Sequence, residues 1–130
     1  MVTDRVGDFI VRLQNAAMVG KREIAVPHSS HIEAIAKKLK ELGFIADVKK
    51  GGDIKKTLTV SLTFGDNGVA RIRGVKRVSK PGRRLYVPAT EAHTVAGGTG
   101  ARVLSTPKGI LSDKEARRDH VGGENLFEIW

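Results

Sequence analysis

Residues 58–64 read Leu-Thr-Val-Ser-Leu-Thr-Phe, an unbroken alternation of apolar and hydroxyl-bearing side chains. Successive side chains of a strand point to opposite faces, so this period of two predicts a strand with one buried face. The residues expected to point inward are Leu58, Val60, Leu62 and Phe64.

Helical and extended patterns alternate before this strand. Residues 4–17 carry apolar side chains at helical spacing, and residues 23–26 form a short strand that Pro27 ends. Residues 44–50 read as a further strand, joined to residues 58–64 through a Gly-Gly-Asp turn. The apolar face of the first helix is expected to comprise Val6, Phe9, Ile10, Leu13 and Ala17.

A second helix is expected to begin at Ser30. Its hydroxyl can cap the helix, and Glu33 three residues later completes a capping box. Gly43 is a suitable C-terminal stop, because glycine often ends a helix. The buried stripe of this helix is expected to comprise Ile32, Ile35, Ala36, Leu39 and Leu42.

The second half of the chain is predicted to be mostly β-structure. Residues 70–78 and 84–87 read as adjacent strands that flank a turn at residues 79–82. Ser112 and Glu115 repeat the capping-box pattern and open a short helix. The other expected elements are a helical turn within 88–95, a loop at 96–100, a strand at 101–105 and a final strand at 124–130.

Together these patterns predict an α+β fold in two small lobes. The N-terminal lobe, residues 1–65, is expected to follow the order α-β-α-β-β. The C-terminal lobe, residues 66–130, is expected to be mostly β with a short helix. The boundary is placed at the turn-rich segment 65–68, which precedes a change to basic composition.

The charge of the chain indicates an anionic partner. Its 130 residues carry 23 Lys and Arg against 14 Asp and Glu, a formal net charge of +9. Nucleic acid is the leading candidate, and a membrane surface is weaker because no helix combines a basic face with a bulky apolar one. Hydrophobic residues make up 40% of the chain, enough for a core.

Several classes of site are not expected. The chain has no cysteine, and its four histidines lack an accompanying set of acidic ligands. No segment approaches the roughly 20 apolar residues of a membrane helix, and residues 1–5 show no hydrophobic signal region. We therefore expect a soluble, cytoplasmic protein with no metal, cofactor, membrane partner or small-molecule substrate.

A run of basic residues stands out in the second half. Residues 67–90 contain seven Lys and Arg and no Asp or Glu. Such a surface can neutralise several phosphates, and the alternative is a solvated strand face kept basic for solubility. We expect binding, because acidic residues are missing throughout the run. The residues expected to contact phosphates are Lys76, Arg77, Lys80, Arg83 and Arg84.

The segment Leu104-Ser-Thr-Pro-Lys-Gly-Ile110 offers hydroxyls, a lysine and backbone N–H groups on an expected tight loop. Such a loop suits RNA that is read by shape and 2′-hydroxyl contacts, and an ordinary β-turn is the alternative. Ser105 and Lys108 also match the Ser-x-x-Lys spacing of a lysine-activated serine nucleophile. That chemistry needs the serine at a helix N-terminus, whereas Pro107 and Gly109 indicate a turn, so no catalytic residue is expected.

The roles of two other residues stay open. Tyr86 can stack on RNA or pack in the core. Glu124, an acid in a basic lobe, can accept a hydrogen bond from an exocyclic amine or a 2′-hydroxyl, or can orient a neighbouring arginine. Two functions are alternatives to RNA binding. One is a hydrolase that uses Ser105 and Lys108, and the other is a DNA-binding repressor module.

Motifs in a fixed order along the chain extend the argument: Thr3-Asp4-x-x-x-Asp8, Arg12-x-x-Asn15-Ala16, Arg77-Val-Ser-Lys-Pro-Gly-Arg-Arg-x-Tyr86, Leu104-Ser-Thr-x-Lys-Gly109, Asp113-x-Glu-Ala-Arg117 and Val121-Gly-Gly-Glu124. This set resembles the bacterial-type family of ribosomal protein eight of the small subunit. The resemblance implies two lobes packed together, and tight binding to a helix in the central domain of small-subunit rRNA early in assembly. It implies neighbouring ribosomal proteins as partners and, as a lesser expectation, autoregulation through the messenger of its own operon.

By position, the resemblance implies primary RNA contacts in the second lobe and secondary contacts in the first. Two positions depart from the family pattern. Pro107 stands where the family usually has serine, which removes a hydroxyl but can stiffen the turn, and Arg102 adds a charge whose role the sequence does not assign. The implied primary contacts are Tyr86, Ser105, Thr106, Pro107, Lys108, Gly122, Gly123 and Glu124, and the secondary ones are Thr3, Arg12, Asn15 and Ser30.

Overall fold

The structure is a computed structural model of the chain, and it describes residues 4–52, 56–88 and 100–130. Helices and antiparallel sheets occur together, which confirms the predicted α+β class. The described residues form two compact units: a first unit of residues 8–73, and a second unit of residues 4–7 with those from 74 onward. The division into domains 1–65 and 66–130 stays a prediction. The two units are defined by which residues lie close together, and this does not test whether either part of the chain folds alone.

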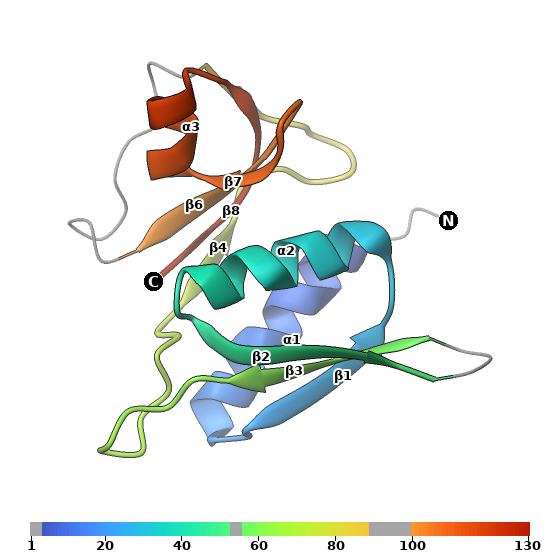
Figure 1. Cartoon of the computed structure of the whole chain (residues 1–130), viewed down its shortest axis with the longest axis vertical. Coiled ribbons are helices and arrows are strands. Elements are labelled where there is room, and N and C mark those ends of the chain that lie inside the picture. The colour runs from blue at the N-terminus through green and yellow to red at the C-terminus, as the bar shows by residue number, and fades with distance from the viewer. Residues whose placement is uncertain (1–3, 53–55, 89–99) are drawn as a thin grey trace. The chain divides into compact units, whose positions relative to one another are not determined.

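The first unit is built on a three-stranded antiparallel sheet in the order β1–β3–β2. These strands span Glu23–Pro27, Thr57–Leu62 and Ile45–Gly51 respectively. Helices α1 (Arg5–Val19) and α2 (Ser30–Glu41) lie on one side of this sheet (Figure 1). The observed order α-β-α-β-β is the predicted one.

The apolar residues of β3 form the middle of the core in the first unit. Leu58, Val60 and Leu62 are buried, as the period of two predicts. Phe64 is an exception, because it lies beyond the end of β3 and is only partly buried. Its ring instead lies under the guanidinium of Arg22, 4.9 Å from the ring centroid. The helices contribute Phe9, Ile10, Leu13 and Ala16 from α1, and Ile32, Ile35, Ala36 and Leu39 from α2.

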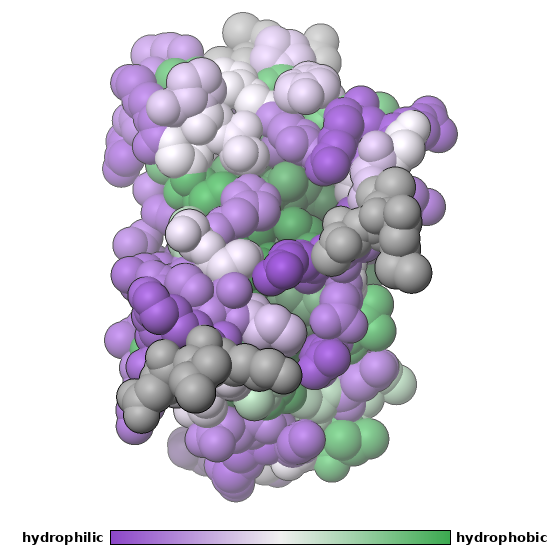
Figure 2. Space-filling view, turned by 90° about the vertical axis from the view of Figure 1, so that its right-hand side faces the viewer, coloured by the Kyte–Doolittle hydropathy of each residue, from purple (hydrophilic) through white to green (hydrophobic). Residues whose placement is uncertain are grey.

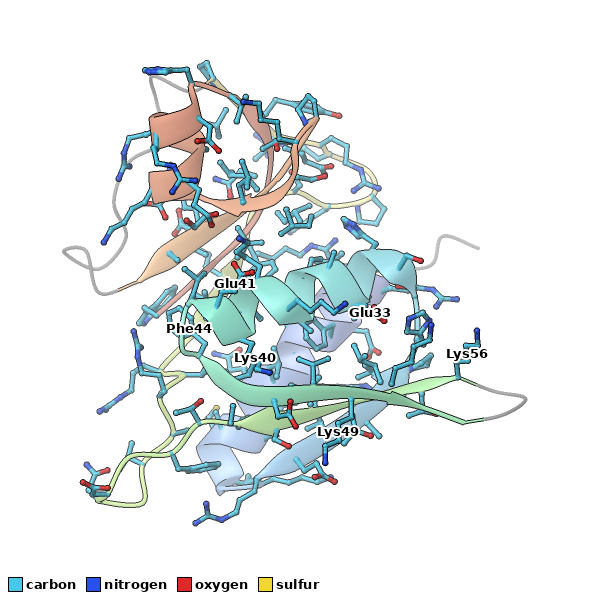
Figure 3. All side chains as sticks on the ribbon, viewed as in Figure 1. Glu33, Lys40, Glu41, Phe44, Lys49 and Lys56 are labelled. Carbon is cyan, nitrogen blue, oxygen red and sulfur yellow. The ribbon has the colours of Figure 1, made fainter. Side chains whose placement is uncertain are left out.

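The opposite face of this sheet is polar. The register places Lys49 of β2 directly opposite Thr59 of β3, and Figure 3 shows Lys49 projecting from the sheet on the side away from α2. Thr57, Thr59 and Ser61 are all partly exposed on this face. The hydroxyl half of the alternating segment is therefore the solvent-facing half.

The predicted cap of α2 is wrong by one residue. Ser29, in an extended conformation, is the N-cap, and the N–H of Ile32 donates to its Oγ at 3.2 Å. Ser30 is the first helical residue, so Glu33 is not in position for a capping box. Its carboxylate instead lies 2.9 Å from His28 Nε2, and this hydrogen bond, aided by Lys37, lowers the pKa of Glu33.

The second unit is a five-stranded antiparallel sheet organised around β8 (Gly123–Ile129). One edge of β8 pairs with β6 (Ala101–Thr106), which pairs in turn with β7 (Gly109–Ser112). The other edge pairs with two short strands, β4 (Val75–Arg77) and β5 (Tyr86–Val87). Their partners are residues 127–129 and 123–124, so β4 and β5 lie end to end along β8.

This pairing corrects the prediction of adjacent strands at 70–78 and 84–87. Both strands are shorter than predicted, and the chain between them, residues 78–85, forms a small loop whose tip leaves the sheet. The ends of the loop still bond to β8, since Val78 N and Ser79 N donate to Leu126 O and Asn125 O, and Asn125 N donates to Leu85 O. Ser79 closes the loop, because its Oγ accepts from Leu85 N at 2.9 Å and donates to Leu85 O at 3.1 Å. Ser79 is buried, and no turn motif in the sequence distinguishes it from an exposed loop serine.

The predicted tight loop at 104–110 is a β-hairpin. Thr106 pairs with Gly109, so Pro107 and Lys108 are the two turn residues, and β7 is a strand that the sequence analysis missed. Gly109 has a φ of 109°, a conformation that favours glycine.

The last helix has the predicted capping box. Helix α3 spans Asp113–Asp119, Ser112 Oγ accepts from Glu115 N, and the Glu115 carboxylate accepts from Ser112 N. Most of the helical turn and loop expected within 88–100 lies in residues 89–99, outside the described residues. None of the helices in the described ranges is both long and apolar enough to cross a membrane.

The corrected cap makes a first prediction. Ser29→Ala should lower the free energy of unfolding by about 1 kcal/mol, because it leaves a helix N–H without its acceptor. Ser30→Ala, one residue later and exposed, should change it by less than about 0.5 kcal/mol. Urea unfolding of both variants distinguishes the two positions, and a larger loss for Ser30→Ala would contradict the assignment.

Candidate nucleic-acid interface

A groove on the second unit brings together nearly all the predicted primary contact residues. We name it the hydroxyl groove. It is formed by the start of β8, the end of β6 and the short strand β5. Of the predicted set, Lys108 alone is not part of the lining. The lining residues are Tyr86, Val87, Pro88, Ser105, Thr106, Pro107, Gly122, Gly123 and Glu124.

Strand register explains why residues far apart in sequence meet here. Glu124 of β8 lies directly opposite Tyr86 on one edge and Ser105 on the other. Cross-strand neighbours of this kind have their side chains close together. Tyr86 is 72% exposed, so it is not a core residue, and its ring is accessible for stacking.

The two hydroxyls of the groove differ in what they can still bind. Thr106 Oγ1 donates to Gly109 O at 2.8 Å and accepts from Lys108 N at 3.1 Å. Its only proton is therefore used within the hairpin, and it can serve a ligand only as an acceptor. Ser105 makes no side-chain hydrogen bond to any described residue and is partly exposed, so its hydroxyl can both donate and accept.

Gly123 has a structural reason to be glycine. A Cβ at this position would overlap the carbonyl group of Ser105 on the neighbouring strand. The turn residue Pro107 is exposed and has no N–H to donate, which leaves Lys108 N to cap the turn through Thr106. The hairpin itself therefore needs no hydroxyl at position 107.

A second groove on the same unit contains the basic residues of the 67–90 run. We name it the basic groove, and its lining is Lys76, Arg77, Val78, Lys80, Arg83, Leu85, Arg102, Asn125 and Glu128. Lys76, Lys80 and Arg83 are exposed and form no ion pair with any described residue. Hydrophilic residues cover most of the face drawn in Figure 2, as expected for a chain with a net charge of +9.

The other arginines near this groove are occupied by carboxylates. Arg77 is ion-paired with Asp4, and its Nε donates to Ser79 O at 2.7 Å. Arg102 Nε lies 3.1 Å from Glu128 Oε1, its cross-strand partner on β8. The role left open for Arg102 is therefore an ion pair within the sheet. Counting charges in sequence overestimates the cations available to a ligand.

Arg84 also has a carboxylate partner, in the hydroxyl groove. Its NH1 donates to Glu124 Oε2 at 3.0 Å. The carboxylate side chain is 17% exposed and the arginine side chain is 50% exposed. Of the roles left open for Glu124, contact with a neighbouring arginine is thus observed.

The secondary candidates lie in the first unit or outside the described residues. Thr3 is outside them. Arg12 is bound to Asp8 at 3.1 Å and to Ala25 O at 3.2 Å, while Asn15 and Ser30 are exposed on α1 and α2. In the described part of the chain, no three His, Cys, Asp or Glu residues are placed to hold a metal ion.

The ion pair at Asp4 predicts an acid-dependent stability. The hydrogen bond from Arg77 is the largest cause of the lowered pKa of Asp4, and the N–H of Gly7 also donates to it. A lowered folded pKa gives stability that is present above the unfolded value of 3.8 and lost as the pH falls below it. Asp4→Asn should therefore cost about 1 kcal/mol or less at neutral pH, and this difference should vanish in acid. Urea unfolding from about pH 7 to pH 2 measures it, and a difference independent of pH would contradict it.

The packing of Gly123 makes a further prediction. Gly123→Ala should destabilise the fold by about 1–3 kcal/mol, because strand β6 must move to admit the methyl group. Gly82→Ala is the matched control, since no atom lies within 4 Å of its added Cβ, and it should change stability by less than about 0.5 kcal/mol. Equal unfolding midpoints for the two variants would show that β6 does not restrict position 123.

Comparison with known proteins identifies the family of this chain. The family model of ribosomal protein S8 matches residues 4–130. A small ribosomal subunit protein uS8 from Chloroflexus aurantiacus is 44% identical over 131 residues, covering 99% of this chain and 98% of the relative. Those from Heliobacterium modesticaldum and Sorangium cellulosum are 45% and 43% identical, and each alignment covers 100% of this chain and at least 99% of the relative. With a family model that matches almost its whole length and relatives this similar, the chain belongs to the ribosomal protein S8 family.

Proposed function

We propose that this protein is a structural, non-catalytic component of the small ribosomal subunit that binds small-subunit rRNA directly through its second unit. The observation that carries the proposal is the hydroxyl groove, where three strands bring Tyr86, Ser105 and Glu124 side by side. These groups can stack on a base and exchange hydrogen bonds with base edges and riboses. The names of its relatives place them in the small ribosomal subunit.

Affinity and selectivity belong to different surfaces in this proposal. Lys76, Lys80 and Arg83 of the basic groove hold phosphates, and each such contact contributes about −0.7 to −0.9 to the log-log salt dependence. The hydroxyl groove selects the RNA, because its groups meet base edges and 2′-hydroxyls. Thr106 can only accept, so the RNA group that meets it is a donor such as a 2′-hydroxyl or an exocyclic amine.

The resemblance to the family implies the partners in this proposal. The rRNA target is a distorted helix in the central domain, bound early in assembly, with neighbouring small-subunit proteins alongside. The place of action is the ribosome, in the bacterial cytoplasm. A similar RNA fold in the messenger of its own operon is a second target, and its binding represses translation. Arg12, Asn15 and Ser30 of the first unit, with Thr3, make secondary RNA contacts.

The alternative functions have less support. Ser105 lies in strand β6 and Lys108 in the hairpin turn, so the serine is not at the start of a helix as lysine-activated hydrolysis needs. A DNA-binding repressor would place a helix or a two-stranded ribbon in the major groove. The shallow groove with hydroxyls and an exposed tyrosine suits an irregular RNA better.

Chemical footprinting of total rRNA with the purified protein tests the proposal. We expect protection of one helix in the central domain of small-subunit rRNA, and of no comparable site in large-subunit rRNA. Protection that is absent, or spread evenly over both rRNAs, would overturn it. A bulged RNA helix and a DNA duplex of equal length, compared at the same salt concentration, separate the RNA-binding protein from the repressor.

The two hydroxyls predict different outcomes on substitution. Ser105→Ala should weaken specific RNA binding about three- to tenfold and leave stability unchanged, because the hydroxyl has no partner among the described residues. Thr106→Ala should weaken specific binding and also destabilise the hairpin, whereas Thr106→Ser should retain both properties. Filter binding with specific and nonspecific RNA, beside urea unfolding, measures this. An equal loss in specific and nonspecific binding would remove the readout role from both residues.

A further inference from the structure

Glu124 is a largely buried acidic residue that lines a groove. Its carboxylate is 17% exposed and lines the hydroxyl groove beside Tyr86 and Ser105. Withdrawing a carboxylate from water is unfavourable unless a counter-charge and hydrogen bonds compensate. The Arg84 guanidinium supplies both through NH1, at 3.0 Å from Oε2.

Three hydrogen bonds fix the backbone of Leu85, the residue after Arg84. Leu85 N donates to Ser79 Oγ at 2.9 Å, and Leu85 O accepts from Ser79 Oγ at 3.1 Å and from Asn125 N at 2.9 Å. Ser79 and Asn125 are both buried, so these bonds are shielded from water. Arg84 and Tyr86 flank Leu85 in the chain, and both are therefore held at fixed places along the groove.

The neighbouring basic residues are in a different situation. Lys80 and Arg83 close the tip of the loop through two backbone hydrogen bonds of 2.9 Å each. Their side chains are exposed and form no ion pair with a described residue. Arg83 and Arg84 are thus adjacent in sequence and alike in chemistry, but one is directed to solvent and the other to a carboxylate.

We propose that Arg84 is a positioning residue, which sets the specificity of the groove through Glu124 and does not serve as a phosphate contact. This inference rests on the function proposed above. Arg84 occupies Oε2 of Glu124 and leaves Oε1 to accept from the RNA, so the groove demands a donor at that point. An exocyclic amine or a 2′-hydroxyl meets that demand, whereas a phosphate oxygen is repelled.

The pairing also explains why Arg84 adds little to nonspecific affinity. The charges of Arg84 and Glu124 cancel at short range, so few counterions are released when RNA phosphates approach them. Arg83 forms no ion pair with any described residue, so its full charge is available to an RNA phosphate. Substitution of Arg83 should therefore change the salt dependence of RNA binding, whereas substitution of Arg84 should not.

A double-mutant cycle on the full chain tests the proposal. The variants are Arg84→Gln, Glu124→Gln and the double variant, with Arg83→Gln as the matched control. The probes are a transcript of the central domain of small-subunit rRNA and a fully paired RNA duplex of the same length. Affinities for both are measured over a series of salt concentrations, and urea unfolding confirms that each variant is folded.

Arg84→Gln should reduce the ratio of specific to nonspecific affinity about tenfold, with an unchanged salt slope. It should have little further effect in the Glu124→Gln background, because the carboxylate through which it acts is gone. Arg83→Gln should lower the slope by about 0.7–0.9 for both RNAs, and its effect should add to that of Glu124→Gln. Arg84→Lys, which keeps a donor and a charge, should restore part of the specificity.

Two results would overturn the inference. In the first, Arg84→Gln lowers the salt dependence of RNA affinity as much as Arg83→Gln does. In the second, the effects of Arg84→Gln and Glu124→Gln on the ratio of specific to nonspecific affinity are fully additive. Failure of the proposed function looks different, because the wild-type protein would then bind the transcript and the duplex equally well. The wild-type comparison therefore decides which of the two ideas fails.

Discussion

The pairing of β8 along both of its edges is the constraint on which the second unit depends. One edge holds β6, and the other holds β4 and β5 end to end. Because two short strands share one edge, the chain between them must leave the sheet, and it does so as the loop carrying Lys80 and Arg83. The same arrangement places residues of three strands around the start of β8. Both grooves of the second unit are therefore consequences of one strand order.

Local sequence patterns correctly predicted the elements whose structure is decided by residues close to one another in the sequence. The alternation at 58–64 identified β3 and its buried face, and the Ser112–Glu115 capping box identified α3. The predictions were wrong where neighbouring residues can play the same local role, or where a strand's partner lies far away in sequence. Ser29 and Ser30 can each cap a helix, and the choice depends on which backbone stays extended. The strands at 70–78 and 84–87 were expected to be adjacent and to flank a turn, because nothing in their sequence reveals that both pair end to end with the same edge of β8.

The composition of the candidate site was predictable, but its internal bonding was not. Resemblance and residue chemistry predicted Tyr86, Ser105 and Glu124 as RNA contacts, and strand register brings these residues together. Sequence does not show that Arg84 is bound to a carboxylate while Arg83 forms no ion pair with any described residue. That difference arises only in the folded chain, where three hydrogen bonds hold Leu85 and the Arg84 side chain beside it reaches Glu124. The number of basic residues in a sequence is thus an upper limit on the cations that can bind a ligand, and each ion pair in the fold lowers that number.

The contact between Gly123 and the Ser105 carbonyl changes how variation at this surface should be interpreted. An alanine at position 123 is disfavoured by the sheet whether or not RNA is present. A glycine kept at this position through evolution would therefore carry no information about the ligand. Ser105 differs, since the fold makes no demand on its hydroxyl within the described residues. Under the proposed function, covariation between a protein position and an RNA base pair should be sought at Ser105, whose hydroxyl has no partner among the described residues.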